Sequence, residues 1–154
     1  VGDVGAMRLE QDWVSPVYGT RSLAPCIRVS SLGAGRREII TLLVPESADG
    51  SAAVRELPAS GGRAVTIDRP EVESSDLLLV RTSGVARVGG IEMDADLALI
   101  RRDASAGDVR WAALFGDQAR LSVDGVSLEA SGAAEFVRHG AGWAVEGAGR
   151  VVVR

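Results

Sequence analysis

Short apolar segments closed by turn-forming residues recur along this chain and leave little room for helices. Turn signals rich in Gly, Pro, Ser and Asp follow these segments at intervals of about eight to twelve residues. No stretch repeats apolar residues at the i, i+3, i+4 and i+7 positions that a helix needs. The pattern predicts an all-β fold, an antiparallel β-sandwich of roughly a dozen short strands with little or no helix. We expect one domain spanning residues 1–154, since no composition change marks a linker.

Alternation of apolar and polar residues predicts the first strand. Met7, Leu9 and Trp13 share one parity, which is typical of a half-buried strand, and Pro16 ends it. Gly19 then permits a turn. The other segments that we expect to be strands are 26–29, 38–44, 54–57, 64–67, 77–82, 85–88, 91–93, 97–101, 110–115, 121–123, 126–128, 134–138, 143–145 and 151–153.

Some of these segments carry further information. The segment 38–44 is apolar on both parities, which is typical of a central strand buried on both faces. Asp124-Gly125 is the pair that a two-residue type I′ hairpin turn favours. The acidic stretch 68–76 reads as a solvated connection, and the glycine-rich 147–149 as a break between two strands.

Composition narrows the class of protein. The formal net charge of −4 gives no general attraction to nucleic acid or to anionic membranes. No apolar run approaches the length of a membrane-spanning helix. All 17 basic residues are arginine, and lysine and asparagine are both absent, which indicates a GC-rich genome. The start, 1–3, carries no signal-peptide pattern and no initiator methionine, so we expect a processed product or a piece excised from a longer protein, either cytoplasmic or secreted.

A few residue types could support acid–base chemistry. Tyr18 stands three residues before Arg21, so its hydroxyl could act as acid or base beside a guanidinium that holds a carboxylate. The alternative, which we favour, is a tyrosine packed at a strand end. His139, the only histidine, is a further candidate, but next to Gly140 it reads as a surface turn residue. Ser15 has no Gly-x-Ser-x-Gly context, which excludes a hydrolase elbow.

Metal and cofactor chemistry find little support. Glu92, Asp94 and Asp96 share one parity and could bind calcium, although such carboxylates more often form the solvent face of a hairpin. The glycine pairs 61–62 and 89–90 lack the lysine and the helix of a phosphate loop. We therefore expect no cofactor and no metal. The lone Cys26 excludes an internal disulfide and reads as a small packing residue.

The three tryptophans allow two interpretations. Trp13, Trp111 and Trp143 could form a platform on which sugar rings stack, as in a carbohydrate-binding module. Because all three lie in alternating strands, packing in the core is the interpretation that we favour. Exposure of all three on one face would support the platform.

The segment 13–45 resembles the C-terminal region of the heparinase II/III-like family of bacterial polysaccharide lyases. The motifs that carry this resemblance are Trp13-Val14-Ser15-Pro16-x-Tyr18-Gly19, Ala24-Pro25, Thr41-Leu42-Leu43-Val44-Pro45, Leu97-Ala98-Leu99-Ile100-Arg101-Arg102-Asp103 and Val123-Asp124-Gly125. The family fold is a helical toroid followed by layered antiparallel β-sheets, and the resemblance implies that this chain is the terminal β part.

What the resemblance implies about function follows from the family's chemistry. Family members cleave glycans that contain uronic acid by β-elimination. No position here matches the family's catalytic or zinc-binding residues, so the chain alone is expected to be inactive. The implied partners are an upstream catalytic domain of the same polypeptide and an acidic polysaccharide. The alternatives are a stand-alone carbohydrate-binding module and a structural or interaction domain.

Overall fold

The computed structural model describes residues 6–15, 17–30 and 52–153. Contacts along the chain divide it into two compact units, Val1–Leu42 and Leu43–Arg154, and each is described here by itself. The strands are β1 (Ala6–Val14), β2 (Ser22–Ser30), β3 (Ala53–Leu57), β4 (Gly62–Arg69), β5 (Ser74–Arg81), β6 (Ala86–Val88), β7 (Ile91–Asp94), β8 (Leu97–Asp103), β9 (Val109–Phe115), β10 (Ala119–Val123), β11 (Val126–His139) and β12 (Gly142–Val153).

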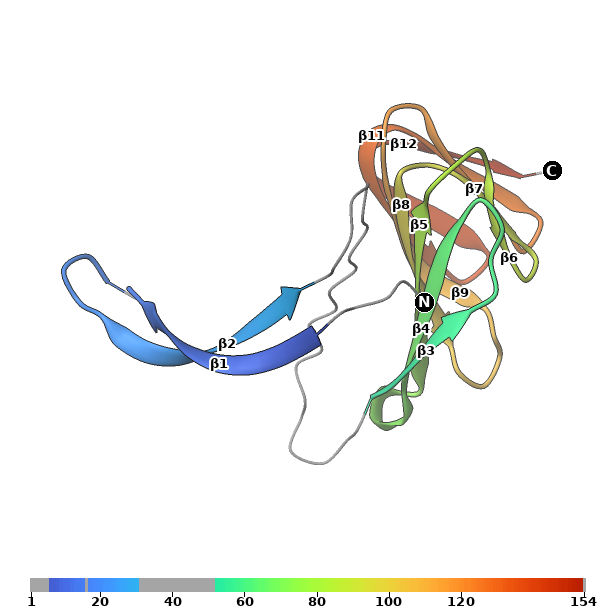
Figure 1. Ribbon diagram of the computed structural model, residues 1–154. Coiled ribbons are helices and arrows are strands. Elements are labelled where there is room, and N and C mark those ends of the chain that lie inside the picture. Colours follow the sequence, from blue (N-terminus) through green and yellow to red (C-terminus); the bar gives the residue numbers. More distant parts are fainter. Residues whose placement is uncertain (1–5, 16, 31–51, 154) are drawn as a thin grey trace. The chain divides into compact units, whose positions relative to one another are not determined.

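The described part of the first unit is an antiparallel hairpin, in which β1 pairs with β2 over nine residues each (Figure 1). The turn between them includes Gly19 at φ +82°, as the sequence predicts. The hydroxyl of Ser15 donates to the carbonyls of Val17 and Thr20 at 3.0 and 2.8 Å and so fixes this turn. Pro25 lies within β2 and is tolerated because each strand of a two-stranded sheet has one unpaired edge.

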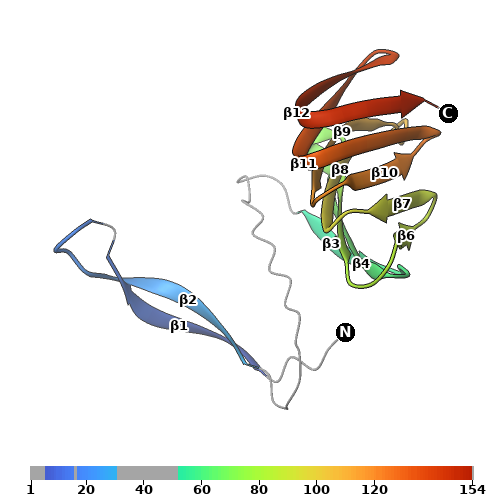
Figure 2. The same ribbon diagram turned by 90° about the horizontal axis from the view of Figure 1, so that it is seen from above.

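The second unit is an all-β, antiparallel sandwich built from one ten-stranded sheet. Its strand order is β3-β4-β5-β8-β9-β11-β10-β7-β6, and β12 pairs with β11. The sheet curls over, as Figure 2 shows, and an isolated bridge between Ser60 and Arg87 links the start of β4 to β6. The expected fold class, a sandwich of about a dozen strands with little helix, is confirmed. The one helical element among the described residues is a 3₁₀ turn, Pro70–Val72.

Strand β11 makes the curled sheet possible because it serves two sets of neighbours. Its first half pairs with β10, its second half pairs with β9, and β12 follows it along both halves. The register shifts between Ala130 and Ala134, where the strand bends. The separate segments predicted at 126–128 and 134–138 are therefore one strand, and 147–149 lies inside β12 rather than between two strands. Glycines of β12, Gly147 and Gly149, leave room beside the bend, because an added Cβ at either position would clash with β11.

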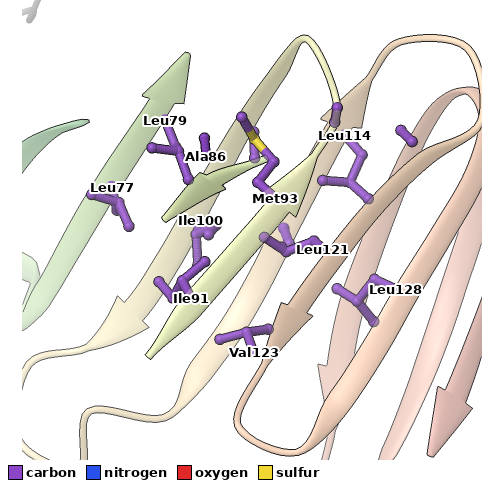
Figure 3. Close-up of a cluster of buried hydrophobic side chains, with 14 of the residues drawn as sticks. Leu77, Leu79, Ala86, Ile91, Met93, Ile100, Leu114, Leu121, Val123 and Leu128 are labelled. Carbon is purple, nitrogen blue, oxygen red and sulfur yellow. The ribbon is translucent and has the colours of Figure 1, made fainter. Parts of the chain in front are cut away.

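The core lies between the two curled halves of the sheet. Phe136, Leu79, Met93, Ile100 and Leu114 are all fully buried within it. Figure 3 shows side chains from β5, β7, β8, β9, β10 and β11 converging on this space. These side chains meet in the core because every second residue of a strand faces inward.

The acidic stretch 68–76 differs from its prediction. It forms the ends of β4 and β5 joined by the 3₁₀ turn, and Asp68 and Asp76 lie in paired strands rather than in a solvated loop. Their carboxylates accept hydrogen bonds from neighbouring strands, which offsets the cost of placing acids within a sheet. The predicted central strand 38–44 lies outside the described residues.

Candidate functional site

A row of alternating charges crosses four strands on the outer face of the second unit. Asp94 in β7 is in register with Arg120 in β10, Arg120 with Glu129 in β11, and Glu129 with Arg150 in β12. Cross-strand partners share a face of a sheet, so these four residues form one ladder. The residue before or after each of them faces the core, and this alternation places the charges outward.

Glu129 is the anchor of this charge ladder. Its side chain is only 18% exposed, and its Oε2 accepts hydrogen bonds from Nε and Nη2 of Arg150 at 2.8 and 2.5 Å. Its Oε1 lies 3.2 Å from Nη2 of Arg120. Hydrogen bonding from Arg150 lowers the pKa of Glu129, the charge of Arg120 adds to this effect, and partial burial opposes it. Glu129 therefore holds two guanidinium groups in fixed positions as an ionised carboxylate.

The charge ladder borders a hollow of about 680 Å³ beside the bend of β11. Its other lining residues are mostly small, which leaves open space between the two arginines and the bent strand. They are Gln118, Ala119, Ala130, Ser131, Gly147, Ala148 and Gly149. Both guanidinium groups remain accessible, with side chains 55% exposed in Arg120 and 76% in Arg150. The volume lies within the range of ordinary ligand sites, roughly 300–1,000 Å³.

The hollow offers donors rather than catalytic groups. Arginine keeps its charge at every physiological pH and presents five N–H groups in a planar fork. The N–H groups that do not contact Glu129 can donate hydrogen bonds to the oxygens of a carboxylate, a sulfate or a hydroxyl group. Because the lining also holds the carboxylates of Asp94 and Glu129, the hollow has no net positive charge, and it suits a group that accepts hydrogen bonds from the arginines.

The residues proposed for acid–base chemistry, Tyr18, Arg21 and His139, are all exposed. Tyr18 is fully exposed in the turn after β1, and Arg21 is exposed just before β2. No hydrogen bond joins these two side chains within the described part of the chain. His139 lies exposed at the end of β11, in the second unit.

The tryptophans occupy different environments. Trp143 packs against the core, whereas Trp13 is 62% exposed in the hairpin. Trp111 is in register with Val137, and Trp143 with Arg138, the next residue of β11. Adjacent positions of a strand face opposite ways, so Trp111 and Trp143 lie on opposite faces of the sheet. These two residues therefore cannot share one sugar platform.

The three carboxylates weighed as calcium ligands contact arginines instead. Glu92 accepts a hydrogen bond from Nε of Arg87 at 2.8 Å. Arg81 donates to Asp94 at 2.8 Å and to Asp96 at 2.7 Å. Within the ranges that the structure describes, no group of three or more potential ligands converges as a metal site would require.

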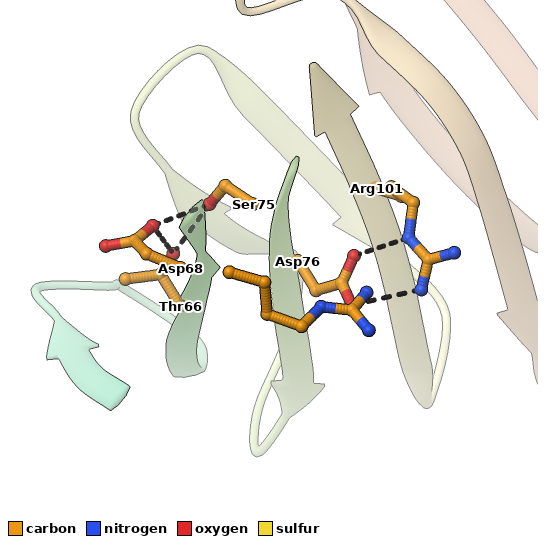
Figure 4. Close-up of polar contacts among 6 residues, drawn as sticks. Thr66, Asp68, Ser75, Asp76 and Arg101 are labelled. Carbon is orange, nitrogen blue, oxygen red and sulfur yellow. Dashed lines mark hydrogen bonds and ion pairs between the residues drawn. The ribbon is translucent and has the colours of Figure 1, made fainter. Parts of the chain in front are cut away.

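Two separate polar clusters lie on opposite faces of β4 and β5 (Figure 4), because Asp68 is in register with Ser75 whereas Asp76, the next residue of β5, is in register with Arg101 of β8. Asp76 accepts hydrogen bonds from Nε and Nη2 of Arg101 at 2.8 and 3.1 Å, and Arg69 pairs with the same carboxylate. Asp68 accepts one from Ser75 at 2.9 Å. Each cluster links neighbouring strands: Asp68 and Ser75 join β4 to β5, and Asp76 joins β5 to β4 and β8.

The sequence alone did not single out the charge ladder. Each of its residues is a charged position within an alternating strand, which is also the signature of an ordinary solvent face. What unites them is the register of four strands, and the bend in β11 that creates the hollow depends on the same pairing. The nearest local signal was the glycine-rich stretch 147–149.

Comparisons with protein-family models, curated proteins and solved structures found no significant match. Among the described residues, no helix has the length and apolar character needed to cross a bilayer.

Proposed function

We propose that this chain is a non-catalytic β-module of a polysaccharide lyase of the heparinase II/III-like kind, and that it contributes an acidic-glycan contact to the parent enzyme. The observation that carries this proposal is the hollow beside Glu129, where Arg120 and Arg150 offer unused donors. Uronate carboxylates are planar and sulfate groups are tetrahedral, and both present a pair of oxygens that suits such forks. The antiparallel sandwich and the motifs quoted above support the parentage.

A tryptophan-based carbohydrate-binding module is the weaker alternative. Trp111 and Trp143 lie on opposite sheet faces, so glycan binding would have to depend on the arginines rather than on stacked rings. If the arginines carry the binding, as we propose, neutral glycans should bind poorly because they lack the anionic group. The two functions therefore differ in the ligands that they favour.

The test is a titration of the 154-residue chain with heparin-derived and alginate oligosaccharides, with a neutral dextran of equal length as comparison. Arg150→Gln and Arg120→Gln should each weaken binding of the acidic oligosaccharides about tenfold, the effect of about 1.5 kcal/mol that a charged hydrogen bond contributes. Arg110→Gln is the matched control, because Arg110 is similarly exposed and paired with Asp103 away from the hollow.

Two results would count against the proposal. Equal losses in Arg110→Gln and Arg150→Gln would indicate a diffuse charge effect rather than a site. Preference for dextran, with binding lost in Trp13→Ala alone, would favour the tryptophan-based alternative.

Under the proposal, binding of the acidic oligosaccharides should also fall as the salt concentration rises, because exposed charges are screened.

A further inference from the structure

Hairpin β1–β2 has one apolar and one polar face. On one face, alternate positions of the paired strands carry seven apolar residues and one polar residue, Gln11. The apolar face comprises Met7, Leu9, Trp13, Leu23, Pro25, Ile27 and Val29. The opposite face carries Arg8, Glu10, Asp12, Val14, Cys26, Arg28 and small residues, and Arg28 pairs with Glu10 at 2.9 Å.

Most of the large side chains on the apolar face are exposed. Leu9, Met7 and Ile27 are 75%, 72% and 59% exposed, and Trp13 and Leu23 are also more than half exposed. A single two-stranded sheet cannot cover its own face, and isolated hairpins are marginally stable in water. A contiguous exposed apolar patch of this kind marks an interaction surface. This surface does not depend on the glycan contact proposed above.

We propose that the apolar face of hairpin β1–β2 docks against the same face of a second copy of this chain. Two such hairpins packed face to face form a four-stranded, two-layer sandwich with the apolar residues between the layers. Both polar faces, including the Arg28–Glu10 pair, then remain in water. Because the same patch serves both partners, the pair is related by a twofold axis.

Gln11 makes the face self-complementary. It is the one polar side chain in the apolar row, next to Leu9 on one side and Trp13 on the other at alternate positions. An amide carries both a donor and an acceptor, so the Gln11 side chains of two copies can hydrogen-bond to each other across the axis. A partner with a purely apolar surface would instead leave this amide without a hydrogen bond.

The area supports a weak dimer. A large apolar side chain offers roughly 60–120 Å² of surface to bury. The seven residues then supply on the order of 500 Å² from each copy, or about 1,000 Å² in total, the lower end for specific protein interfaces. We therefore expect a concentration-dependent equilibrium between monomer and dimer rather than a permanent dimer.

The first experiment measures the mass of the chain by sedimentation equilibrium over a concentration series that reaches about 1 mM. Ile27→Glu, on the apolar face, should weaken the dimer at least tenfold. Ser22→Glu adds the same charge on the polar face and should leave the dimer unchanged. Gln11→Glu preserves the side-chain shape, should weaken the dimer at pH 7, and should recover below about pH 4, where the carboxyl is protonated.

Cys26 provides the second measurement. It is the only cysteine and lies on the polar face, so a spin label there leaves the proposed interface intact. Sheets pack about 10 Å apart, and labels on the two outer faces should give one distance of roughly 20–40 Å. This distance should vanish in Ile27→Glu and persist in Ser22→Glu.

A monomer at every concentration would overturn the proposal and would indicate that a surface other than a second copy covers the face. A dimer that survives both Ile27→Glu and Gln11→Glu would also overturn it, because the contact would then lie elsewhere. Gln11→Glu separates loss of the interface from loss of the hairpin, since its acid recovery requires an intact strand.

Discussion

The guanidinium carbon of Arg101 lies over the indole ring of Trp111, 5.9 Å from its centroid. Arg101 is itself held by Asp76, and Nε1 of Trp111 donates to Glu135 at 3.3 Å. A cation this close to an aromatic face is attracted to the ring and takes the place that a sugar would need. Trp111 therefore belongs to a set of side-chain contacts that links β5, β8, β9 and β11.

The two phenylalanines should differ greatly in their contribution to stability. Phe136 is fully buried in the core, whereas Phe115 is 41% exposed. Phe136→Ala should lower the free energy of unfolding by about 3–5 kcal/mol, because it removes buried contacts and leaves a cavity. Phe115→Ala, the matched control, should cost about 1 kcal/mol. Urea denaturation of both variants tests this, and equal costs would contradict the assignment of the core.

The hairpin turn between β10 and β11 should depend on Gly125. Asp124 and Gly125 have φ of +50° and +74°, as a type I′ turn requires. Gly125→Val should destabilise the protein by roughly 1 kcal/mol or more, because β-branched residues fit positive φ poorly. Gly90→Val is the control, since an added Cβ at Gly90 also meets open space but no positive φ is required there. A similar melting temperature for both variants would contradict the prediction.

Asp103 should stabilise the β8–β9 loop in a pH-dependent manner. It accepts hydrogen bonds from the Ser105 hydroxyl at 2.6 Å, from the Ser105 and Ala106 amides at 3.0 Å each, and from Arg110 at 2.8 Å. These contacts hold the pKa of Asp103 well below its ordinary value, and the hydrogen bond from the Ser105 hydroxyl has the largest effect. A depressed carboxyl pKa stabilises the fold above the unfolded value of about 3.9, and this contribution is lost as the pH falls further.

Asp103→Asn should therefore lower stability at pH 7, and its difference from the parent chain should shrink below about pH 4. Thermal melts across the pH series measure this difference. Asp117→Asn, a change at an exposed loop carboxylate, should have little effect at any pH. A difference for Asp103→Asn that does not vary with pH would show that charge is not the cause.

The isolated chain should release no unsaturated uronate from heparin, heparan sulfate or alginate. β-Elimination needs a base, a carboxylate clamp and an acid within hydrogen-bond reach of one sugar. Among the described residues, Tyr18 and His139 are both exposed, and no hydrogen bond joins Tyr18 to Arg21. The assay is the ultraviolet absorbance of the new conjugated double bond. Turnover that Tyr18→Phe abolishes without lowering the melting temperature would instead identify Tyr18 as catalytic.

Local patterns were enough to predict most strands. Alternation around Met93 and Leu121, and the turn at Asp124-Gly125, depend on neighbours in sequence, and the structure has strands and a turn there. The acidic stretch 68–76 was predicted wrongly because its carboxylates are satisfied by residues on other strands. Polar composition alone does not distinguish a loop from a sheet face whose charges are paired.

The candidate site depends on non-local pairing. Arg120 and Arg150 stand 30 positions apart and meet only because both strands flank Glu129. A single sequence does not fix that register, nor the bend at Ala130. The two faces of hairpin β1–β2, in contrast, follow directly from the parity of residues such as Leu9 and Trp13.

The double pairing of β11 has a consequence for how the second unit opens. Along both of its halves this strand has hydrogen-bonded neighbours on its two edges, β10 or β9 on one side and β12 on the other. The amides of residues 126–130 and 134–137, which are paired on both edges, should exchange with solvent deuterium only when the whole unit unfolds. Within the described chain, β12 pairs on one edge alone, so its outward amides should exchange in local openings. The slowest-exchanging segment of this protein should thus be the bent strand that also carries Glu129.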